Sequence, residues 1–449
     1  MDNRRYTNTI QRTMKHTFIL MMYLASCFCM YADTLTINQA IMKALEQSYA
    51  IRIAKNDAEI ASVKTSYAAA GMLPVISASA GQVGGINTIN QSLLSGQEIV
   101  RESAGNKGSN AGIALNWTLF DGFGMFASYD RLQALKHIGE LRLRASMQQT
   151  IGNVMRAYCA MIRNQALIRA AMERVELSKE GVRLATLRFS VGRSGEQEQL
   201  QATVELHADS TALLRLQEQL RQSRLQLNNA IGGYADTLYA VSSEFPAFDI
   251  DGEILNTMLI QEHNPDLMAV KAGTIAADAM LRQMEARAYP TLSLNSEYNF
   301  NQSSNDGSFV VSSRVRGASF ALTAQYSLLD GFRLGQQIEA ASIEKKNTEL
   351  QTAQVLDNLL ASHGIAKGAY LTGKSIVALQ EQNISLAEKN ASIAMERYKQ
   401  GAMSNYDFRI SAQSIFDARS TLAQAKYEQS ISALELLLLT GSLQKIINQ

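Results

Sequence analysis

One stretch of the sequence could bind a nucleotide: it runs from Gly368 to Ser375 and reads GAYLTGKS. It satisfies the pattern G-x-x-x-x-G-K-[ST], in which backbone N–H groups cradle phosphates and the lysine reaches the terminal ones. That chemistry requires a strand before the loop and a helix that begins directly after it. No apolar strand precedes Gly368, and the periodicity of a long helix continues through the stretch. We therefore interpret it as a chance match inside a helix, where Gly364, Gly368 and Gly373 allow close helix packing or slight bending.

Few other side chains have the spacing that catalysis or metal binding requires. The five histidines are dispersed, and none forms the i, i+4 pair that binds a metal on one helix face. The nucleophile motif G-x-S-x-G is absent. The net charge of +1 gives no electrostatic footprint for nucleic acid. We therefore expect no enzyme, no cofactor, no metal site and no nucleic-acid partner.

Residues 1–32 have the pattern of a secretory signal peptide. Positive charges precede an apolar run that is too short and wrongly flanked for a membrane-spanning helix. We expect cleavage near Ala32, which leaves Cys159 as the only cysteine of the mature chain. Cys27 also fits a box at which lipoproteins are processed.

The sequence contains two copies of one unit. Arg188 in RFSVG and Arg397 in RYKQG are 209 residues apart (397 − 188 = 209), and TLFDGF and SLLDGF have the same separation. Upstream, Pro74 and Pro290 are 216 residues apart (290 − 74 = 216), so the first copy carries seven extra residues. The expected boundaries are 33–232 for the first repeat, 233–252 for a connector and 253–449 for the second repeat.

Each repeat has the same expected order of elements. A helix with apolar periodicity comes first, as over Ile37–Ala70, and it ends before a proline. Two strands follow, in which apolar residues such as Leu115 and Trp117 alternate with small polar ones. The expected strands are 73–83 and 110–120 in the first repeat, and 290–302 and 315–329 in the second. Loops rich in Gly, Ser and Asn are expected between them, over about 84–109 and 303–317.

An Asp-Gly turn connects the second strand of each repeat to a long helix. The turn residues are Asp121 and Gly122 in the first repeat and Asp330 and Gly331 in the second. Both aspartates are candidate N-caps. The helices are expected over 123–189 and 332–398, and about 67 residues at 1.5 Å each give about 100 Å. Their apolar residues recur at steps of three and four, as in a coiled coil, and a glycine turn leads to a returning helix.

The strands favour a membrane barrel, because their apolar face suits lipid and their small polar face suits a water-filled lumen. Four strands cannot close a barrel, and enclosing a channel takes more than eight. We therefore expect a mainly α-helical fold in which several chains share one transmembrane β-barrel. The long helices would leave this barrel on one side and are long enough to cross a bacterial periplasm.

The sequence resembles the outer-membrane efflux protein family, the TolC-like channels. The resemblance rests on the doubled unit, on LFDG and LLDG at the strand-to-helix turns, on RFSVG and RYKQG at the helix tips, and on TLTINQAIMKAL as the mature start. It implies a homotrimer that embeds a twelve-stranded barrel in the lipid of the outer membrane and forms a helical barrel in the periplasm. It also implies a passive exit channel of a tripartite efflux pump or a type I secretion system. The implied partners are a periplasmic adaptor protein and an inner-membrane pump of the RND or ABC type.

The resemblance also implies where the periplasmic end closes. Acidic residues line the constriction in the family, and Asp407 matches one such position. Glu198 is its counterpart in the first repeat, so three chains would supply up to six carboxylates. The next acidic position of the family is Ile410 here, and Met403 replaces the gate arginine of some members. Alternatively, Glu198 and Asp407 are only charges that the helix dipole favours.

The helix tips match the turns at which the family docks its adaptor. The matching residues are Val191, Gly192 and Arg193 in the first repeat and Gln400, Gly401 and Ala402 in the second. Their alternative role is turn geometry, which needs glycine.

This architecture decides against a lipid on Cys27. The first helix would lie about 50 Å below the barrel, whereas the residues from Cys27 to Leu35 reach about 28 Å when extended. A rival interpretation, a soluble or surface-attached coiled-coil protein, explains the helices but not the symmetric strand pairs.

Overall fold

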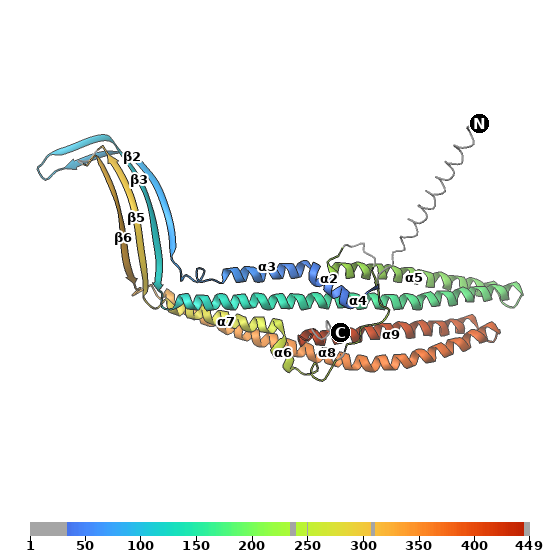
Figure 1. Ribbon diagram of the computed structural model, residues 1–449. Helices are drawn as coiled ribbons and strands as arrows, with labels where there is room; N and C mark the ends of the chain where they lie inside the picture. The colour runs from blue at the N-terminus through green and yellow to red at the C-terminus, as the bar shows by residue number, and fades with distance from the viewer. Residues whose placement is uncertain (1–33, 234–238, 249, 307–309, 444–449) are drawn as a thin grey trace, which may run out of the picture. The chain divides into compact units, whose positions relative to one another are not determined.

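The computed structural model describes residues 34–233, 239–248, 250–306 and 310–443. The expected signal peptide and its cleavage site lie outside these residues. The fold is mainly α-helical, with a four-stranded and a two-stranded sheet (Figure 1). The chain divides into two compact units. Of the described residues, the first unit comprises 34–48, 151–233, 239–248 and 369–434, and the second comprises 49–150, 250–306, 310–368 and 435–443.

The same order of elements occurs twice. The first repeat contains β1 (Thr34–Leu35), α2 (Ile37–Gln47), α3 (Tyr49–Lys64), β2 (Val75–Ser92), β3 (Glu98–Phe120), α4 (Gly124–Ser190) and α5 (Glu196–Ile231). The second contains β4 (Ala240–Val241), α6 (Met258–His263), α7 (Pro265–Ala286), β5 (Thr291–Asn305), β6 (Ser312–Gln325), α8 (Arg333–Lys399) and α9 (Asn405–Leu439). β4 lies within the segment 233–252 that the sequence analysis expects to be a connector, so the order of elements repeats from before residue 253. The long helices α4 and α8 have 67 residues each, and both begin and end 209 residues apart (333 − 124, 399 − 190).

The turn before each long helix has the same backbone in both repeats. Gly122 and Gly331 have a φ of +71°, in the left-handed region that glycine adopts without steric cost. The following Phe123 and Phe332 also have positive φ, 70° and 63°, which is rare for a bulky residue. Two successive left-handed residues therefore turn the chain from strand to helix in each repeat.

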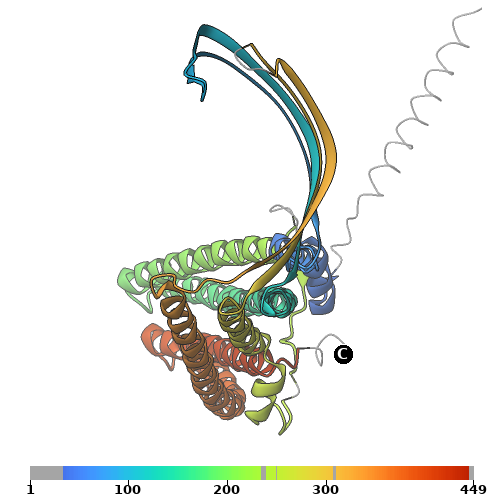
Figure 2. The same cartoon turned by 90° about the vertical axis from the view of Figure 1, so that its left-hand side faces the viewer.

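The large sheet has the order β2-β3-β5-β6, with all neighbours antiparallel, and it is strongly curved (Figure 2). Since successive side chains in a strand point to opposite faces, the register assigns each residue to a face. One face is polar and rich in asparagine, including Asn106, Asn110, Asn116, Asn295, Asn299, Asn301 and Asn305. The other face is mostly apolar and includes Leu115 and Phe320. β2 and β6 are the edges.

The strands of the first hairpin are longer than the sequence analysis expects. Pairing continues to Ser92 opposite Glu98, so residues 84–109 are mostly strand and not loop. The sequence misleads here because glycines on the polar face make room for asparagines on the paired strand. A β-carbon at Gly81 would come within 2.8 Å of Asn110 Oδ1. Glycine and asparagine therefore indicate cross-strand pairs here, although they are typical of turns.

The last strand and the first helix also differ from expectation. β6 ends at Gln325 and not at 329, because β5 begins at Thr291, opposite Gln325, and offers no partner beyond it. The expected helix 37–70 is two helices, α2 and α3, with a break at Ser48, whose extended backbone (ψ 123°) cannot continue a helix. The second helix ends at Lys64.

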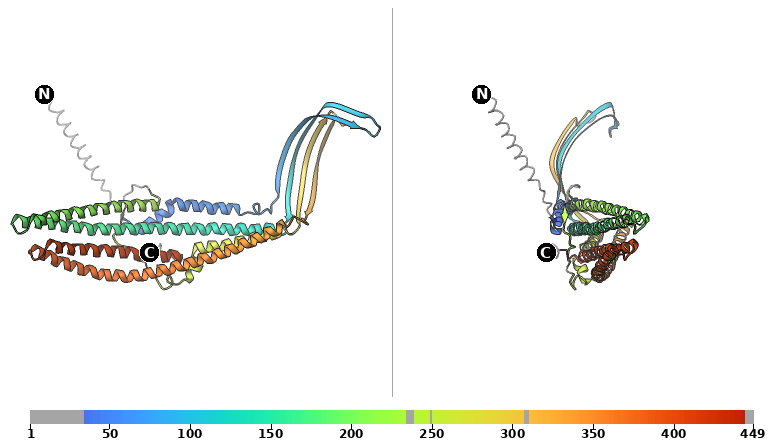
Figure 3. Two further views of the ribbon diagram at one scale, coloured as in Figure 1. Left: turned by 180° about the vertical axis from the view of Figure 1, so that it is seen from behind. Right: turned by 90° about the vertical axis from the view of Figure 1, so that its right-hand side faces the viewer.

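The first unit contains two helix pairs, the C-terminal part of α4 with α5 and that of α8 with α9 (Figure 3). The buried face of α4 includes Val154, Met155 and Met161. The Tyr158 hydroxyl donates to the Leu35 carbonyl at 2.9 Å and accepts from Ser242 N–H at 3.3 Å. It thus fixes the small parallel sheet of β1 and β4 to α4.

The nucleotide-like stretch is part of a continuous helix, because residues 368–375 lie inside α8. Among the three glycines expected to allow close packing, only Gly373 has a close neighbour, with its β-carbon position 3.4 Å from Cβ of Gln429. The equivalent positions at Gly364 and Gly368 meet no atom of the described chain within 4 Å. None of the helices in the described part of the chain is both long and apolar enough to cross a membrane.

Candidate functional site at the helix tips

The tip turns of the two repeats share one hydrogen-bond pattern. Gly192 and Gly401 have φ of +74° and +75°. Arg193 N–H donates to the Arg188 carbonyl at 2.8 Å, and Ala402 N–H donates to the Arg397 carbonyl at 2.9 Å. In each turn an N–H donates to the carbonyl five residues earlier, next to a left-handed glycine. This combination is the Schellman motif, which ends a helix. All six predicted docking residues are exposed on these turns.

The two predicted gate carboxylates occupy equivalent places, each at the third residue of a helix. Glu198 in α5 forms an ion pair with Arg188 Nη1 at 3.1 Å, and the Glu198 side chain is 26% exposed. Asp407 in α9 accepts from Ser404 Oγ at 2.7 Å, and Ser404 Oγ accepts from Asp407 N–H at 3.2 Å. Asp407 is exposed. Both carboxylates lie where the helix dipole favours negative charge, but only Asp407 is free of a cationic partner within the described residues.

Arg188 is the residue that joins the two tips. Its Nη2 donates to the Tyr398 carbonyl, and its guanidinium lies 4.2 Å from the centroid of the Tyr398 ring. The Tyr398 ring stacks on Phe408, with centroids 4.8 Å apart and planes 4° from parallel. Leu184 and Met403 pack against this pair. A small apolar core with one cation on its edge therefore holds α4, α8 and α9 together in the first unit.

The Tyr398 hydroxyl is buried, and it makes no hydrogen bond of normal geometry in the described part of the chain, although the Glu198 carboxylate lies close to it. Burial raises the pKa of Tyr398 to about 12, and the nearby Glu198 carboxylate acts in the same direction. The Arg188 charge opposes both effects. The phenol therefore stays neutral at any physiological pH.

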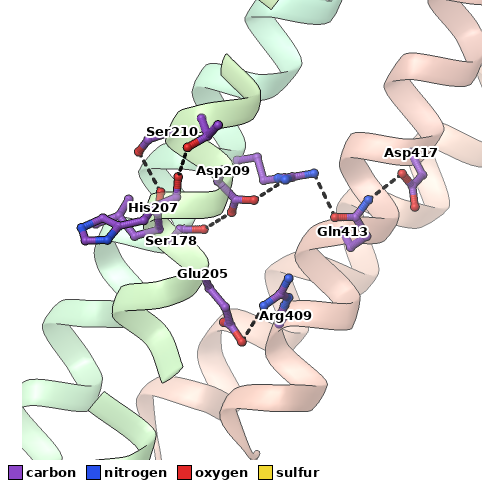
Figure 4. A network of polar contacts seen from close by, with 11 residues as sticks. Ser178, Glu205, His207, Asp209, Ser210, Arg409, Gln413 and Asp417 are labelled. Carbon is purple, nitrogen blue, oxygen red and sulfur yellow. Dashed lines mark hydrogen bonds and ion pairs between the residues drawn. The ribbon is translucent and has the colours of Figure 1, made fainter. Parts of the chain in front are cut away.

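A second polar network joins the helix pairs further along the first unit (Figure 4). Asp209 of α5 accepts from Arg174 and, at 2.5 Å, from Ser178 Oγ, both of α4. Arg174 Nη1 also donates to Gln413 Oε1 of α9 at 3.0 Å. Arg409 of α9 forms an ion pair with Glu205 of α5 at 2.6 Å.

Two arginines of α4 repeat the same contact with α9. Arg163 lies 4.7 Å from the ring centroid of Tyr427, and Arg174 lies 4.7 Å from that of Phe416. The two arginines are 11 residues apart (174 − 163), and so are the two rings in the opposite chain direction (427 − 416). Cation–π contacts of this kind are worth about 0.5–2 kcal/mol each. They set the register of α4 against α9.

The two predicted gate residues therefore have different surroundings. The structure joins Glu198 to Arg188 and Asp407 to Ser404, and gives no direct contact between the two carboxylates within the described residues. Sequence reasoning missed Arg188, although Arg397 holds the matching position in the second repeat. Ile410, at the family's second acidic position, is 52% exposed.

The two Asp-Gly turns also differ. Asp330 Oδ2 accepts from Leu334 N–H at 2.8 Å in the first turn of α8. Asp121 Oδ1 is buried and has no partner within the described residues. A β-carbon at Gly122 would lie 2.3 Å from the Ala286 carbonyl, so the end of α7 packs closely on this turn. The equivalent position at Gly331 has no described neighbour within 4 Å.

Comparison with known proteins agrees with this architecture. The model of the family described as outer membrane efflux protein matches residues 40–233 and 258–442. Protein CyaE of Bordetella pertussis is 25% identical over 328 residues, which cover 71% of this chain and 65% of that protein.

Two solved structures show the same fold. The chain resembles CusC with a TM-score of 0.78 and 16% identity, covering 91% of this chain and 92% of that one. It resembles the CmeC outer membrane channel of Campylobacter jejuni with a TM-score of 0.77 and 19% identity, covering 90% and 85%. The chain therefore belongs to the outer membrane efflux protein family, and it is an outer-membrane protein with a large helical part in the periplasm.

Proposed function

We propose that three copies of this chain form a passive exit channel through the outer membrane. The channel would serve a tripartite efflux pump or a type I secretion system, through a periplasmic adaptor and an inner-membrane pump of the RND or ABC type. One observation carries the proposal. The first repeat packs against the second through one surface on each, whereas the equivalent surface of the other repeat stays exposed in the described chain.

The sheet supplies the first such surface. β3 of the first repeat pairs with β5 of the second, whereas β6 and β2 have no further partner in the described chain. In lipid, each unpaired backbone group costs several kcal/mol. Pairing β6 of one chain with β2 of the next repeats the β3–β5 relationship, and three chains close a barrel of twelve strands. A barrel of this size encloses a channel, whereas eight strands leave room only for packed side chains.

The helices supply the second surface. Leu141 of α4 is 1% exposed because α7 covers it, but its counterpart in α8, Leu350 (141 + 209), is 69% exposed. On the other side, Ala279 of α7 is fully buried, but its counterpart in α3, Val63 (279 − 216), is 75% exposed. By the symmetry of the repeats, α3 of one chain covers Leu350 of the next. Such a head-to-tail contact generates a ring.

The tips supply the constriction and the docking surface. Because Arg188 neutralises Glu198, the three Asp407 carboxylates contribute most of the negative field at the closed end. The exposed turns at 191–193 and 400–402 are available to an adaptor. A soluble or surface-attached coiled-coil protein remains the weaker alternative, since it gives the curved, two-faced sheet no role.

The mass of the detergent-extracted protein tests this proposal. Wild type should require detergent and have the mass of three chains. Leu350→Glu should yield monomers, because it places a charge in the contact with α3. Gln351→Glu adds the same charge about 100° around the helix and should remain trimeric. A wild-type monomer that is stable in plain buffer, or a trimeric Leu350→Glu variant, would contradict the proposal.

A further inference from the structure

The apolar face of the sheet changes character along the strands. After a first row of Phe120, Leu292 and Ala324, at the end where the strands join the helices, four further successive rows are mostly apolar. The rows are Trp117, Leu294 and Leu322; Ile76, Leu115, Ser296 and Phe320; Ala78, Ile113, Tyr298 and Ala318; and Ala80, Ala111, Phe300 and Arg316. The next two rows contain only polar residues and glycine: Gln82, Ser109, Gln302 and Arg314; and Gly84, Lys107, Ser304 and Ser312.

Three cations mark this change, and we infer that Lys107, Arg314 and Arg316 bind the phosphate groups of the phosphorylated glycolipid, lipid A, in the outer leaflet of the membrane. The inference rests on the proposed function, in which this face meets lipid. The strands join the periplasmic helices at one end, so their hairpin ends point outward. The cations lie in the rows nearest the β5–β6 hairpin, and β2 and β3 continue beyond these rows to the pair of Ser92 and Glu98.

The register places the three cations within reach of one lipid headgroup. Arg314 and Arg316 lie on the same face of β6, two residues and therefore about 7 Å apart. Lys107 on β3 is separated from β6 by β5, and neighbouring strands are about 4.8 Å apart, so it lies roughly 10 Å across the sheet. Long lysine and arginine side chains cover these distances.

No carboxylate lies in any of these six rows, of which the last three hold the cations. Glu297 pairs with Ala114 of β3 and Ser319 of β6 on the asparagine-rich face, so the sheet itself separates its charge from the cations. All three cations are exposed, and none has an ion pair within the described residues. The six rows therefore carry three positive charges and no negative one.

Asp306 is an acidic residue next to the patch, beside Gly105. Its N–H donates to the Gly105 carbonyl at 2.9 Å, beyond the last of the six rows. Its Oδ2 would lie 2.9 Å from a β-carbon at Gly105, so the carboxylate is one row further toward the hairpin ends than Lys107. Even when this carboxylate is included, the surface keeps an excess of two positive charges.

The position of the cations relative to the membrane favours a lipid phosphate as their partner. Together with the first row of Phe120, Leu292 and Ala324, the four apolar rows extend about 27 Å along the strands. Tyr298 and Phe300 form the aromatic border that barrels place at the membrane interface. The cations begin at this border, at the level of the headgroups. Guanidinium groups bind phosphate through two parallel hydrogen bonds, which suits the two arginines.

Lipid binding by the purified trimer in detergent tests the inference. The probes are lipid A with its phosphates and the same lipid after dephosphorylation, and native mass spectrometry measures the lipid bound per trimer. We expect roughly a fivefold loss of affinity per cation and about a hundredfold loss for the triple variant Lys107→Gln, Arg314→Gln, Arg316→Gln. The triple variant Arg333→Gln, Lys346→Gln, Lys374→Gln removes three exposed charges from α8 and should bind as wild type does.

Two results would overturn the inference: lipid A binding by the sheet variant with wild-type affinity, or equal binding of the dephosphorylated lipid by wild type. The same spectra report the number of chains. A failure of the proposed trimer therefore appears as a wrong protein mass, separately from a failure of phosphate recognition.

Discussion

The guanidinium of Arg188 lies against the ring of Tyr398, 4.2 Å from its centroid, and donates to the Tyr398 carbonyl. Arg188 is near the end of α4, and Tyr398 is near the end of α8. One cation from the first repeat therefore fixes the last turn of the second repeat's long helix. The same cation neutralises Glu198.

Replacing Arg188 should loosen the tips. Arg188→Met leaves the partly buried Glu198 carboxylate without its cation and the Tyr398 carbonyl without its donor, which costs about 1–3 kcal/mol. We expect faster hydrogen exchange in the tip peptides and a lower midpoint of thermal unfolding. Arg193→Met, at an exposed position of the same turn, is the control and should change neither. Unchanged exchange in the Arg188 variant would show that the link carries no stability.

Tyr398→Phe should have the opposite effect on the stability of the fold. The hydroxyl is buried without a hydrogen bond of normal geometry in the described structure, so its removal abolishes a desolvation cost and keeps the stacked ring. We expect stability to be unchanged or to rise by up to about 1 kcal/mol. Thermal unfolding of wild type and variant measures the difference. A loss of more than about 1 kcal/mol would mean that the hydroxyl has a partner, with Glu198 the nearest candidate.

The pair of Asp278 and Lys345 predicts a pH dependence. Lys345 Nζ donates to Asp278 Oδ1 at 2.7 Å, and this hydrogen bond lowers the pKa of Asp278 and raises that of Lys345. A lowered carboxyl pKa stabilises the fold above the unfolded pKa of about 3.9, and this contribution is lost as the pH falls through the folded value.

Lys345→Met should therefore cause a small decrease in the unfolding midpoint at pH 7, because the pair is partly exposed and screened. The decrease should begin to shrink below about pH 4, because Asp278 of the unfolded chain then takes up a proton. It should disappear once the pH falls through the lowered pKa of Asp278 in the folded protein. Lys346→Met, at the exposed neighbouring position, is the control. A difference between wild type and the Lys345 variant that stays constant from pH 7 to pH 3 would contradict this assignment.

Cys159 should resist thiol reagents. Its side chain is buried in α4, and burial raises the pKa of the thiol to about 12. Since the thiolate is the reactive form, we expect no labelling by a maleimide at pH 7 in the native protein and complete labelling after denaturation. A cysteine placed at the exposed Val191 should react in the native state. Rapid labelling of native Cys159 would mean that the helix pair opens in solution.

The long helices could be predicted from the sequence almost to the residue. The Asp-Gly turns and the glycine at each tip mark the helix ends locally. Each of these signals occurs in both repeats at the same separation, so one copy supports the other. The strands could be predicted in place but not in length. Gly81 and Asn110 form a cross-strand pair, and a single sequence does not distinguish such a pair from a turn.

The candidate site could be predicted only in part. The carboxylates at the helix tips have a local signal, since each lies three residues into a helix. The contact of Arg188 with Tyr398 joins residues 210 positions apart (398 − 188), and it depends on how four helices pack. Arg188 begins the RFSVG motif and has a counterpart in Arg397 of RYKQG, but neither motif indicates that its partner is Tyr398.

Planar-bilayer recording can test the claim that the chain forms a passive channel with its narrowest part at the acidic helix tips. Wild-type trimers should conduct without nucleotide and prefer cations, because clustered carboxylates focus the field in a constriction. Glu198→Gln with Asp407→Asn should lower the cation preference and weaken block by multivalent cations, with the trimer intact. Glu297→Gln, on the asparagine-rich face of the sheet, should have a smaller effect. Trimers that do not conduct, or a double variant with wild-type selectivity and block, would contradict the claim.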